Sequence, residues 1–147
     1  DLTREVCPPR TGREQYDLLR RYLDARHENG GMADMTPGDY VAMVEETAVD
    51  TFVTEYRRAD GVLLACLLGD RMQDGISLVY SFFDPRAEKR SLGSFIILDQ
   101  IARAKEAEHA HVYLGYLIED CRKMAYKKRF APLQRLGQDG WEDYHPG

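Results

Sequence analysis

Two stretches of the sequence combine residue types that could bind a nucleotide and support acyl transfer. The first runs Arg90-Ser91-Leu92-Gly93 and opens a segment with helical periodicity. The N-terminus of a helix presents backbone N–H groups to an anion, and two further bases, Arg86 and Lys89, lie just before it. The stretch therefore predicts either a phosphate-binding turn or an ordinary helix start whose basic residues face solvent.

The second stretch joins a tyrosine-rich strand to a basic helix. Strand alternation places Tyr116 at the carboxyl end of a predicted strand, a usual position for ligands. Helical spacing then brings Lys123, Tyr126 and Lys127 to adjacent positions. Cations bind phosphates and aromatic rings stack on bases, so this pattern is typical of a site for a single-stranded nucleotide end. The alternative is a solvated basic helix whose tyrosines belong to the core.

Metal and cysteine chemistry receive less support. His109 and His111 are two residues apart and would share one face of a strand, but no HExxH frame and no third ligand lies close to them in the sequence, so no metal site is expected. The three cysteines, Cys7, Cys66 and Cys121, are odd in number and form no CxxC pair. The sequence therefore predicts a cytoplasmic protein with reduced thiols rather than a disulfide framework.

The charge of the chain is uneven. The 147 residues carry a net charge of −5, which excludes a generally basic nucleic-acid binder. Residues 34–50 hold five acids and no base, whereas residues 121–135 hold six bases and no acid. No apolar run approaches the length of a membrane-spanning helix, and the N-terminus lacks the pattern of a signal peptide. We therefore expect no membrane association and, at most, a local site for a nucleic acid.

Periodicity and turn residues predict the elements that would position these side chains. A short edge strand over 1–7 comes first, followed by helices at about 12–29 and 37–46. Three antiparallel strands are expected next, at 51–57, 62–68 and 75–83. They are followed by a helix at 91–108, a strand at 111–116, a basic helix at 120–130 and a last strand at 131–136. The third helix is predicted to face inward through Leu92, Phe95, Leu98, Ile101 and Ala102.

This order predicts an α/β fold in which a mixed, twisted sheet has helices on both faces. It is similar to the element order of the GNAT (N-acetyltransferase-like) fold. Acyl-CoA enzymes of that fold carry a loop of the form Arg/Gln-x-x-Gly-x-Gly/Ala at the start of the central helix, and the resemblance places residues 90–95 there. Phe95 stands where that loop has a small residue, which argues against acetyl-CoA.

Longer motifs resemble the C-terminal domain of the aminoacyl-tRNA–protein transferases, the arginyl- and leucyltransferases of the N-degron pathway. The similarity covers about residues 1–142, and its main motifs, in the family's order, are Ser81-Phe82-Phe83-Asp84-Pro85, Arg90-Ser91-Leu92-Gly93, Tyr113-Leu114-Gly115-Tyr116, Lys123-Met124-Ala125-Tyr126-Lys127, Phe130 and Pro132. The resemblance implies one GNAT-like catalytic domain over 1–147, with 143–147 as a disordered tail. The family's cysteine-bearing N-terminal domain has no counterpart in this sequence, so we expect an excised C-terminal domain.

The resemblance also implies an activity, which is transfer of leucine or arginine from aminoacyl-tRNA to the N-terminal amine of proteins beginning with Asp or Glu. Aminoacyl-tRNA is the co-substrate, and no cofactor or metal is expected. Tyr80, Tyr116 and Tyr126 are assigned to the reaction centre, one of them as a proton relay. The residues assigned to the tRNA 3′ end or to the acidic N-terminus are Arg90, Ser91, Gly93, Lys123, Lys127, Lys128 and Arg129.

Two alternatives stay open at this point. The first is an acetyl-CoA-dependent N-acetyltransferase, and the second is a module that only binds tRNA or acidic N-termini. The sequence predicts no particular oligomeric state.

Overall fold

The computed structural model describes residues 2–26, 35–114, 133–138 and 140–144. Its elements are, in chain order, β1 (Leu2–Cys7), α1 (Arg13–Arg26), α2 (Pro37–Glu45), β2 (Asp50–Arg58), β3 (Leu63–Met72), β4 (Gly75–Phe83), the 3-10 helix η2 (Pro85–Arg90), α3 (Leu92–Glu106), β5 (His111–Tyr113), β6 (Leu133–Gly137) and β7 (Gly140–Tyr144). The chain divides into two compact units, Asp1–Gly115 and Tyr116–Gly147, and each is described by itself.

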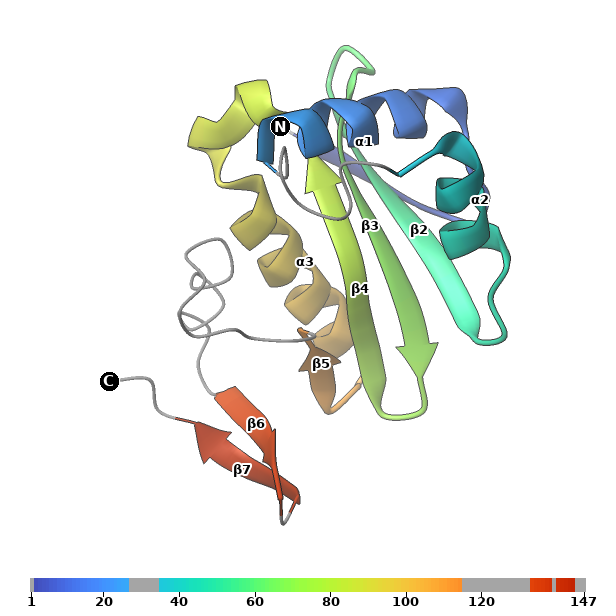
Figure 1. Cartoon of the computed structure of the whole chain (residues 1–147). Helices are drawn as coiled ribbons and strands as arrows, with labels where there is room; N and C mark the ends of the chain where they lie inside the picture. Colours follow the sequence, from blue (N-terminus) through green and yellow to red (C-terminus); the bar gives the residue numbers. More distant parts are fainter. Residues whose placement is uncertain (1, 27–34, 115–132, 139, 145–147) are drawn as a thin grey trace. The chain divides into compact units, whose positions relative to one another are not determined.

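The first unit is built on a five-stranded sheet with the strand order β1-β2-β3-β4-β5 (Figure 1). Neighbouring strands from β1 to β4 are antiparallel, and β5 pairs with β4 in the parallel sense. The predicted edge strand and three-strand meander are confirmed. β3 is the middle strand, and its residues from Leu63 to Gly69 are buried, as the continuous apolar run predicts.

Consecutive residues of β2 show that α1 and α3 cover opposite faces of the sheet. Side chains of neighbouring strand residues point to opposite faces. Glu55 accepts a hydrogen bond from Gln15 of α1 (2.8 Å), whereas Tyr56 donates one to Asp99 of α3 (2.8 Å). α2 shares the α1 face, since Tyr40 of α2 donates to Gln15 (2.7 Å). The prediction of a mixed sheet with helices on both faces is therefore confirmed.

Apolar residues of α1 fill the space between that helix and the sheet. Leu18, Leu19 and Leu23 are completely buried. Tyr22 packs edge-on against Phe83 at the end of β4, with ring centroids 5.0 Å apart. Each such side chain gains about 1.5–3 kcal/mol on transfer from water. Their spacing of three or four residues makes one continuous apolar stripe, which holds α1 across the sheet.

α2 begins where the sequence places its cap. The Thr36 hydroxyl accepts a hydrogen bond from the backbone N–H of Asp39 (3.1 Å), and the Asp39 carboxylate accepts one from the N–H of Thr36 (3.0 Å). This reciprocal capping box satisfies two backbone donors, and Pro37 occupies the first helical turn. Tyr40 and Val44, one turn apart, are the buried residues of the helix.

The buried face of α3 differs from the prediction. Leu92 is buried as expected, but Phe95, Leu98, Ile101 and Ala102 are exposed. The other buried positions are Ile96, Ile97, Gln100 and Ala104. The buried face includes a polar residue, because Gln100 donates a hydrogen bond to the hydroxyl of Tyr56 (3.0 Å). A prediction built on apolar residues cannot place a glutamine inside, and it therefore selected the wrong side of the helix.

The second unit contains the antiparallel hairpin β6–β7, in which Leu133 lies opposite Tyr144 and Gly137 opposite Gly140. β6 corresponds to the last strand predicted at 131–136. The predicted tail, 143–147, begins inside β7, because the ladder with β6 continues to Tyr144. The predicted basic helix at 120–130 lies outside the described residues. No helix in the described part of the chain is long and apolar enough to cross a membrane.

Candidate functional site

The end of β4 and the start of α3 frame the candidate site. β4 pairs with β5 from Gly75 to Ser77, and the rest of the strand continues to Phe83. A register shift between Leu68 and Gly69 of β3 marks a β-bulge, which leaves Val79 as the extra residue of β4. Bulges redirect side chains, and this one immediately precedes Tyr80.

Tyr80 lies on the α1 face of the sheet within a cluster of aromatic rings. Its ring centroid is 6.3 Å from that of Tyr22 and 6.1 Å from that of Phe82. The side chain is half-buried and its hydroxyl oxygen is buried. The neighbouring rings therefore fix the direction in which this hydroxyl points.

Ser91 is the N-cap of α3 and has a left-handed backbone, with φ 51° and ψ 50°. Its side chain is exposed and makes no capping hydrogen bond, although its carbonyl accepts from the N–H of Phe95 (3.0 Å). The hydroxyl therefore does not occupy the N–H groups of the first turn. Gly93 lies half-buried in that turn. The predicted helix start is confirmed, while phosphate binding at it stays a prediction.

The remaining predicted site residues are not brought together by the described structure. Arg90 ends η2, and its side chain is not among those described. The predicted site residues that lie outside the described residues altogether are Tyr116, Lys123, Tyr126, Lys127, Lys128 and Arg129.

Sequence reasoning missed a carboxylate–guanidinium pair between β4 and η2. Arg86 donates to Asp84 through Nε (3.0 Å) and Nη2 (2.8 Å), and the backbone N–H of Arg86 donates to the same carboxylate (2.9 Å). These bonds from Arg86 hold the pKa of the Asp84 carboxyl below its ordinary value. The motif Asp84-Pro85-Arg86 could have predicted this contact, because an aspartate before a proline favours a turn whose backbone N–H groups the aspartate side chain can bind.

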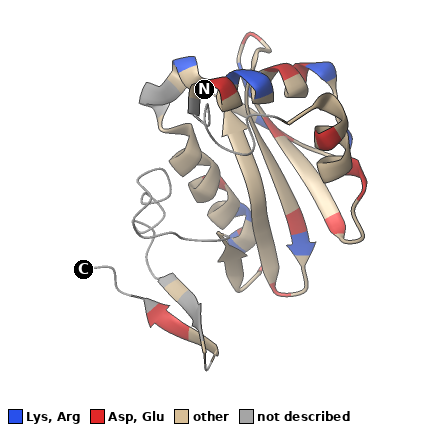
Figure 2. Ribbon diagram, viewed as in Figure 1, with Lys and Arg blue, Asp and Glu red and all other residues tan. Residues whose placement is uncertain are grey.

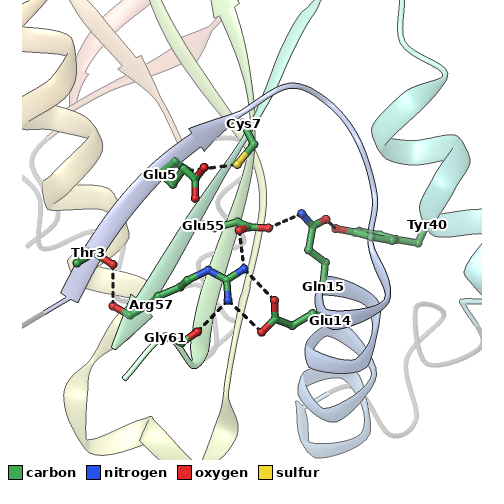
Figure 3. Close-up of polar contacts among 9 residues, drawn as sticks. All are labelled: Thr3, Glu5, Cys7, Glu14, Gln15, Tyr40, Glu55, Arg57 and Gly61. Carbon is green, nitrogen blue, oxygen red and sulfur yellow. Dashed lines mark hydrogen bonds and ion pairs between the residues drawn. The ribbon is translucent and has the colours of Figure 1, made fainter. Parts of the chain in front are cut away.

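A second network, also unpredicted, joins α1, α2 and β2 (Figure 3). Arg57 donates to both carboxylate oxygens of Glu14 (2.8 and 3.0 Å) and to Glu55 (2.8 Å). Glu55 also accepts from Gln15, which in turn accepts from Tyr40. Hydrogen bonds to the two carboxylates raise the pKa of Arg57, and burial raises that of Tyr40. Both groups therefore keep their protons at neutral pH, and the network acts as a structural link.

One group of side chains has the composition of a metal site. Ligand atoms of Glu5, Cys7 and Glu55 lie within 4.8 Å of one another (Figure 3). The oxygens of Glu55 already accept hydrogen bonds from Arg57 and Gln15. The guanidinium charge beside this carboxylate also opposes a second cation. The arrangement thus favours hydrogen bonding within the protein over metal coordination.

His111 is the first residue of β5, and His109 lies two residues before it. His111 Nδ1 is 3.7 Å from Asp74, and the hydroxyl of Tyr113 donates to the same carboxylate (2.7 Å). These groups are partly or fully exposed at the turn between β3 and β4. Their geometry holds β5 to that turn.

Comparison with a known structure supports the fold. The chain resembles the crystal structure of a putative acyl-CoA N-acyltransferase from Klebsiella pneumoniae, with a TM-score of 0.60. The alignment covers 99% of this chain and 90% of that one at 18% identity. The predicted GNAT-like fold is therefore confirmed, and at this identity the likeness concerns the fold alone.

Curated relatives are much more similar in sequence. An aspartate/glutamate leucyltransferase from Parvibaculum lavamentivorans is 53% identical over 99% of this chain and 60% of its own length. One from Mesorhizobium japonicum is 55% identical over 89% of this chain and 56% of its own length. This chain thus spans about three fifths of the length of these relatives.

Residues 14–137 match the sequence model of a family described as "Arginine-tRNA-protein transferase, C terminus". This stretch includes the end of β4, the start of α3 and every predicted site residue. The resemblance found from the motifs is therefore confirmed. The chain belongs to the arginine-tRNA-protein transferase family and matches its C-terminal part.

Proposed function

We propose that this chain transfers leucine from leucyl-tRNA to the N-terminal amine of proteins that begin with Asp or Glu. The observation that carries the proposal is the identity of 53% over 99% of the chain to a relative named aspartate/glutamate leucyltransferase. The family description names arginine, whereas the relatives named above are leucyltransferases. Leucine is therefore the favoured amino acid.

The chemistry is an acyl transfer between an activated ester and an amine. The α-amino nitrogen attacks the ester carbonyl carbon, so a C–N bond forms and the C–O bond to the terminal ribose breaks. The amine loses one proton, and the departing ribose oxygen takes one up. An α-amino group has a pKa of about 8, so a sizeable fraction is already the neutral nucleophile near neutral pH. Positioning of the two reactants can then supply much of the acceleration.

The site residues receive roles within this proposal. Tyr80, together with Tyr116 and Tyr126, is proposed to line the reaction centre, with one hydroxyl relaying the proton. The buried hydroxyl of Tyr80, held among aromatic rings, supports its place in this set.

The first turn of α3 receives the 3′ end of the tRNA in this proposal. Its support is the exposed Ser91 hydroxyl, which does not cap the helix, and the half-buried Gly93. Arg90, Lys123, Lys127, Lys128 and Arg129 are proposed to bind the phosphates of that end or the acidic side chain of the acceptor.

A transfer assay tests the proposal. The chain would be mixed with leucyl-tRNA, arginyl-tRNA or acetyl-CoA and with peptides that differ only in a first residue of Asp, Glu or Ala. We expect labelled leucine on the Asp and Glu peptides and none on the Ala peptide. Transfer of an acetyl group instead would support the alternative N-acetyltransferase. Absence of any transfer would contradict the proposal for this chain. The same assay with a full-length relative would show whether the remaining two fifths of those proteins are required.

We also propose that the protein acts in the cytoplasm. Aminoacyl-tRNA is made and used there, and Cys7 and Cys66 are both free thiols.

A further inference from the structure

An arginine at the end of β4 is exposed and yet held rigidly. The side chain of Arg86 is 75% exposed, whereas that of its partner Asp84 is 4% exposed. Asp84 is fixed in turn by its own backbone, because its N–H donates to the carbonyl of Leu64 (2.8 Å) and its carbonyl accepts from Ala87 (3.0 Å). A buried carboxylate thus orients a guanidinium toward solvent.

A second arginine, at the turn between β2 and β3, has the same hydrogen-bonding geometry with a partner that is exposed. Arg58 donates to Asp60 through Nε (3.1 Å) and Nη2 (2.7 Å). In both pairs the aspartate takes the Nε–Nη2 edge of the guanidinium. The two N–H groups of Nη1 in Arg58 and in Arg86 therefore point away from the aspartate.

A third arginine, Arg21 of α1, lies at the same end of the sheet. It is exposed, and none of the ion pairs in the described part of the chain includes it. Its charge lowers the pKa of Asp84, so the two groups are near each other. The contact of their sequence neighbours, Tyr22 with Phe83, supports the same placement.

The three arginines form one surface, which we call the arginine end: Arg21, Arg58 and Arg86. The charge of Arg86 also acts on Arg58, which links the β2–β3 turn to η2. In Figure 1 this turn, α1 and η2, the short helix between β4 and α3, lie at the same end of the sheet. Figure 2 shows basic residues on both α1 and η2 there. In the sequence, Lys89 and Arg90 follow Arg86 before α3 begins.

The local charge at this end differs from that of the whole protein. The arginine end supplies three basic residues against Asp60 and Asp84, the two aspartates that pair with Arg58 and Arg86, while the chain as a whole is at −5. The guanidinium groups of Arg58 and Arg86 are already oriented by their aspartates, so they lose less conformational entropy when they bind a phosphate. The three side chains also come from three separate elements, so their charges are spread over an area of the protein surface.

We propose that the arginine end binds the phosphodiester backbone of the tRNA acceptor stem, next to the 3′ end at the start of α3. This inference rests on the proposed function, because it needs a tRNA at the adjacent site. The observation behind this placement is that η2, which carries Arg86, leads directly into Ser91 and α3. The surface then contributes to tRNA affinity without touching the reacting ester.

The test measures tRNA binding and transfer for variants of this surface. Arg21→Gln, Arg58→Gln and Arg86→Gln are made singly and together, and binding of labelled, deacylated tRNA is followed at several salt concentrations. Each substitution is expected to lower the slope of log affinity against log salt by about 1. Arg86→Lys keeps the charge but loses the fork, so we expect it to keep the slope and to weaken binding. In transfer, the triple variant should raise KM for leucyl-tRNA with little change in kcat.

A short leucylated 3′ fragment without a stem provides the second arm. The triple variant should use this fragment as well as the unaltered chain does, because the fragment does not reach the arginine end. Arg71→Gln is the matched control, since Arg71 and Arg58 are both 47% exposed and each pairs with one aspartate. Arg71 lies at the opposite end of β3 from the β2–β3 turn, so its loss should leave the salt slope unchanged.

The outcomes separate this inference from the function on which it rests. If the unaltered chain binds tRNA and transfers leucine while the triple variant keeps its slope and KM, the inference is overturned and the function stands. Loss of peptide binding with unchanged tRNA binding would also overturn the inference, because the arginine end would then bind the acceptor peptide. If the unaltered chain binds no tRNA, the inference and the proposed function fail together. Circular dichroism confirms that each variant is folded.

Discussion

A side chain on Gly75 would overlap the backbone carbonyl oxygen of His111, its register partner in the parallel pairing of β4 with β5. Only glycine allows these two backbones to approach so closely. Gly75 therefore determines how closely β5 approaches β4 at the start of their pairing. The obstacle would be backbone rather than the end of a flexible side chain, so it cannot be relieved by a rotamer change.

We expect Gly75→Ala to lower the free energy of unfolding by about 1–3 kcal/mol, because the extra methyl group must displace a strand. Urea denaturation measures this loss. Gly12→Ala is the control, since a Cβ at Gly12 meets no atom within 4 Å. Its expected change is no more than about 1 kcal/mol. Equal effects at the two positions would show that close packing does not require Gly75.

The hydroxyl of Tyr56 links a buried amide, Gln100, to a partly buried carboxylate, Asp99, so its removal should be costly. It donates to Asp99 and accepts from Gln100, and burial raises its pKa, which keeps it protonated. Tyr56→Phe leaves the amide of Gln100 buried without this partner, and we expect a loss of about 1–3 kcal/mol in unfolding free energy. Tyr113→Phe removes a hydroxyl bond from an exposed carboxylate and should change stability much less. A small effect at Tyr56 would contradict this reading of the α3 face.

Cys7 should react slowly with thiol reagents. Burial raises the pKa of its thiol, and the charges of Glu55 and Glu5 raise it further. The thiolate is the reactive form, so less of it is present at pH values near 8 than for an unhindered cysteine. Peptide mass mapping after iodoacetamide treatment should show slower labelling of Cys7 than of free cysteine. Glu5→Gln should speed labelling, whereas Glu106→Gln on α3 should not; identical rates in all three proteins would argue against the electrostatic cause.

The pair of Asp84 and Arg86 makes stability depend on acid pH. The folded pKa of Asp84 is below the unfolded value of about 3.9. Its contribution is therefore complete above that value and is lost as the pH falls through the folded pKa. Asp84→Asn should destabilise the protein at neutral pH, and its effect should shrink as the pH falls below about 3.9 toward the folded pKa, because the natural carboxyl then also becomes neutral. Thermal melts across this range measure the difference.

Asp17→Asn is the control variant for the pH dependence of Asp84→Asn. Asp17 is exposed, and its pair with Arg13 spans 4.0 Å, so its melting curve should run parallel to that of the unaltered chain. If the loss in melting temperature of Asp84→Asn stayed constant down to pH 3, the charge of Asp84 would have no part in the effect.

Ser91 holds a left-handed backbone that costs a side chain about 1–2 kcal/mol. Ser91→Gly should therefore be neutral or stabilising, and Ser91→Val should be less stable than Ser91→Gly by about that amount. Ser94→Gly, in the first turn of α3, is expected to lose about 0.5–1 kcal/mol instead. If the Ser91→Gly variant keeps its stability but loses affinity for tRNA, the hydroxyl of Ser91 contributes to tRNA binding. A destabilised Ser91→Gly would contradict the assigned conformation.

Most of the fold could be predicted because its elements carry local signals. Thr36, Pro37 and Asp39 form a cap that can be recognised within four residues. The continuous apolar run of β3 identifies a strand buried on both faces. The inward face of α3 could not be predicted in this way, because Gln100 is buried by a partner 44 residues away.

The candidate site could be predicted only in part. The start of α3 was found from Ser91 and Gly93, since helix starts have a local pattern. The link from Glu55 to Gln15 was missed, because 40 residues separate the two and no periodicity relates them. The gathering of Arg21, Arg58 and Arg86 depends likewise on three elements meeting at one end of the sheet.

The edge position of β1 affects how separate molecules meet. An outermost strand offers its backbone as a template for the strand of another molecule, which is a route to fibres. β1 carries exposed charges at Arg4 and Glu5 in its middle, and Arg4 is bound to Asp99 of α3. A second copy that paired there would have to bury these charges. Arg4, which docks the first strand on α3, therefore also helps to protect the protein from edge-to-edge aggregation at high concentration.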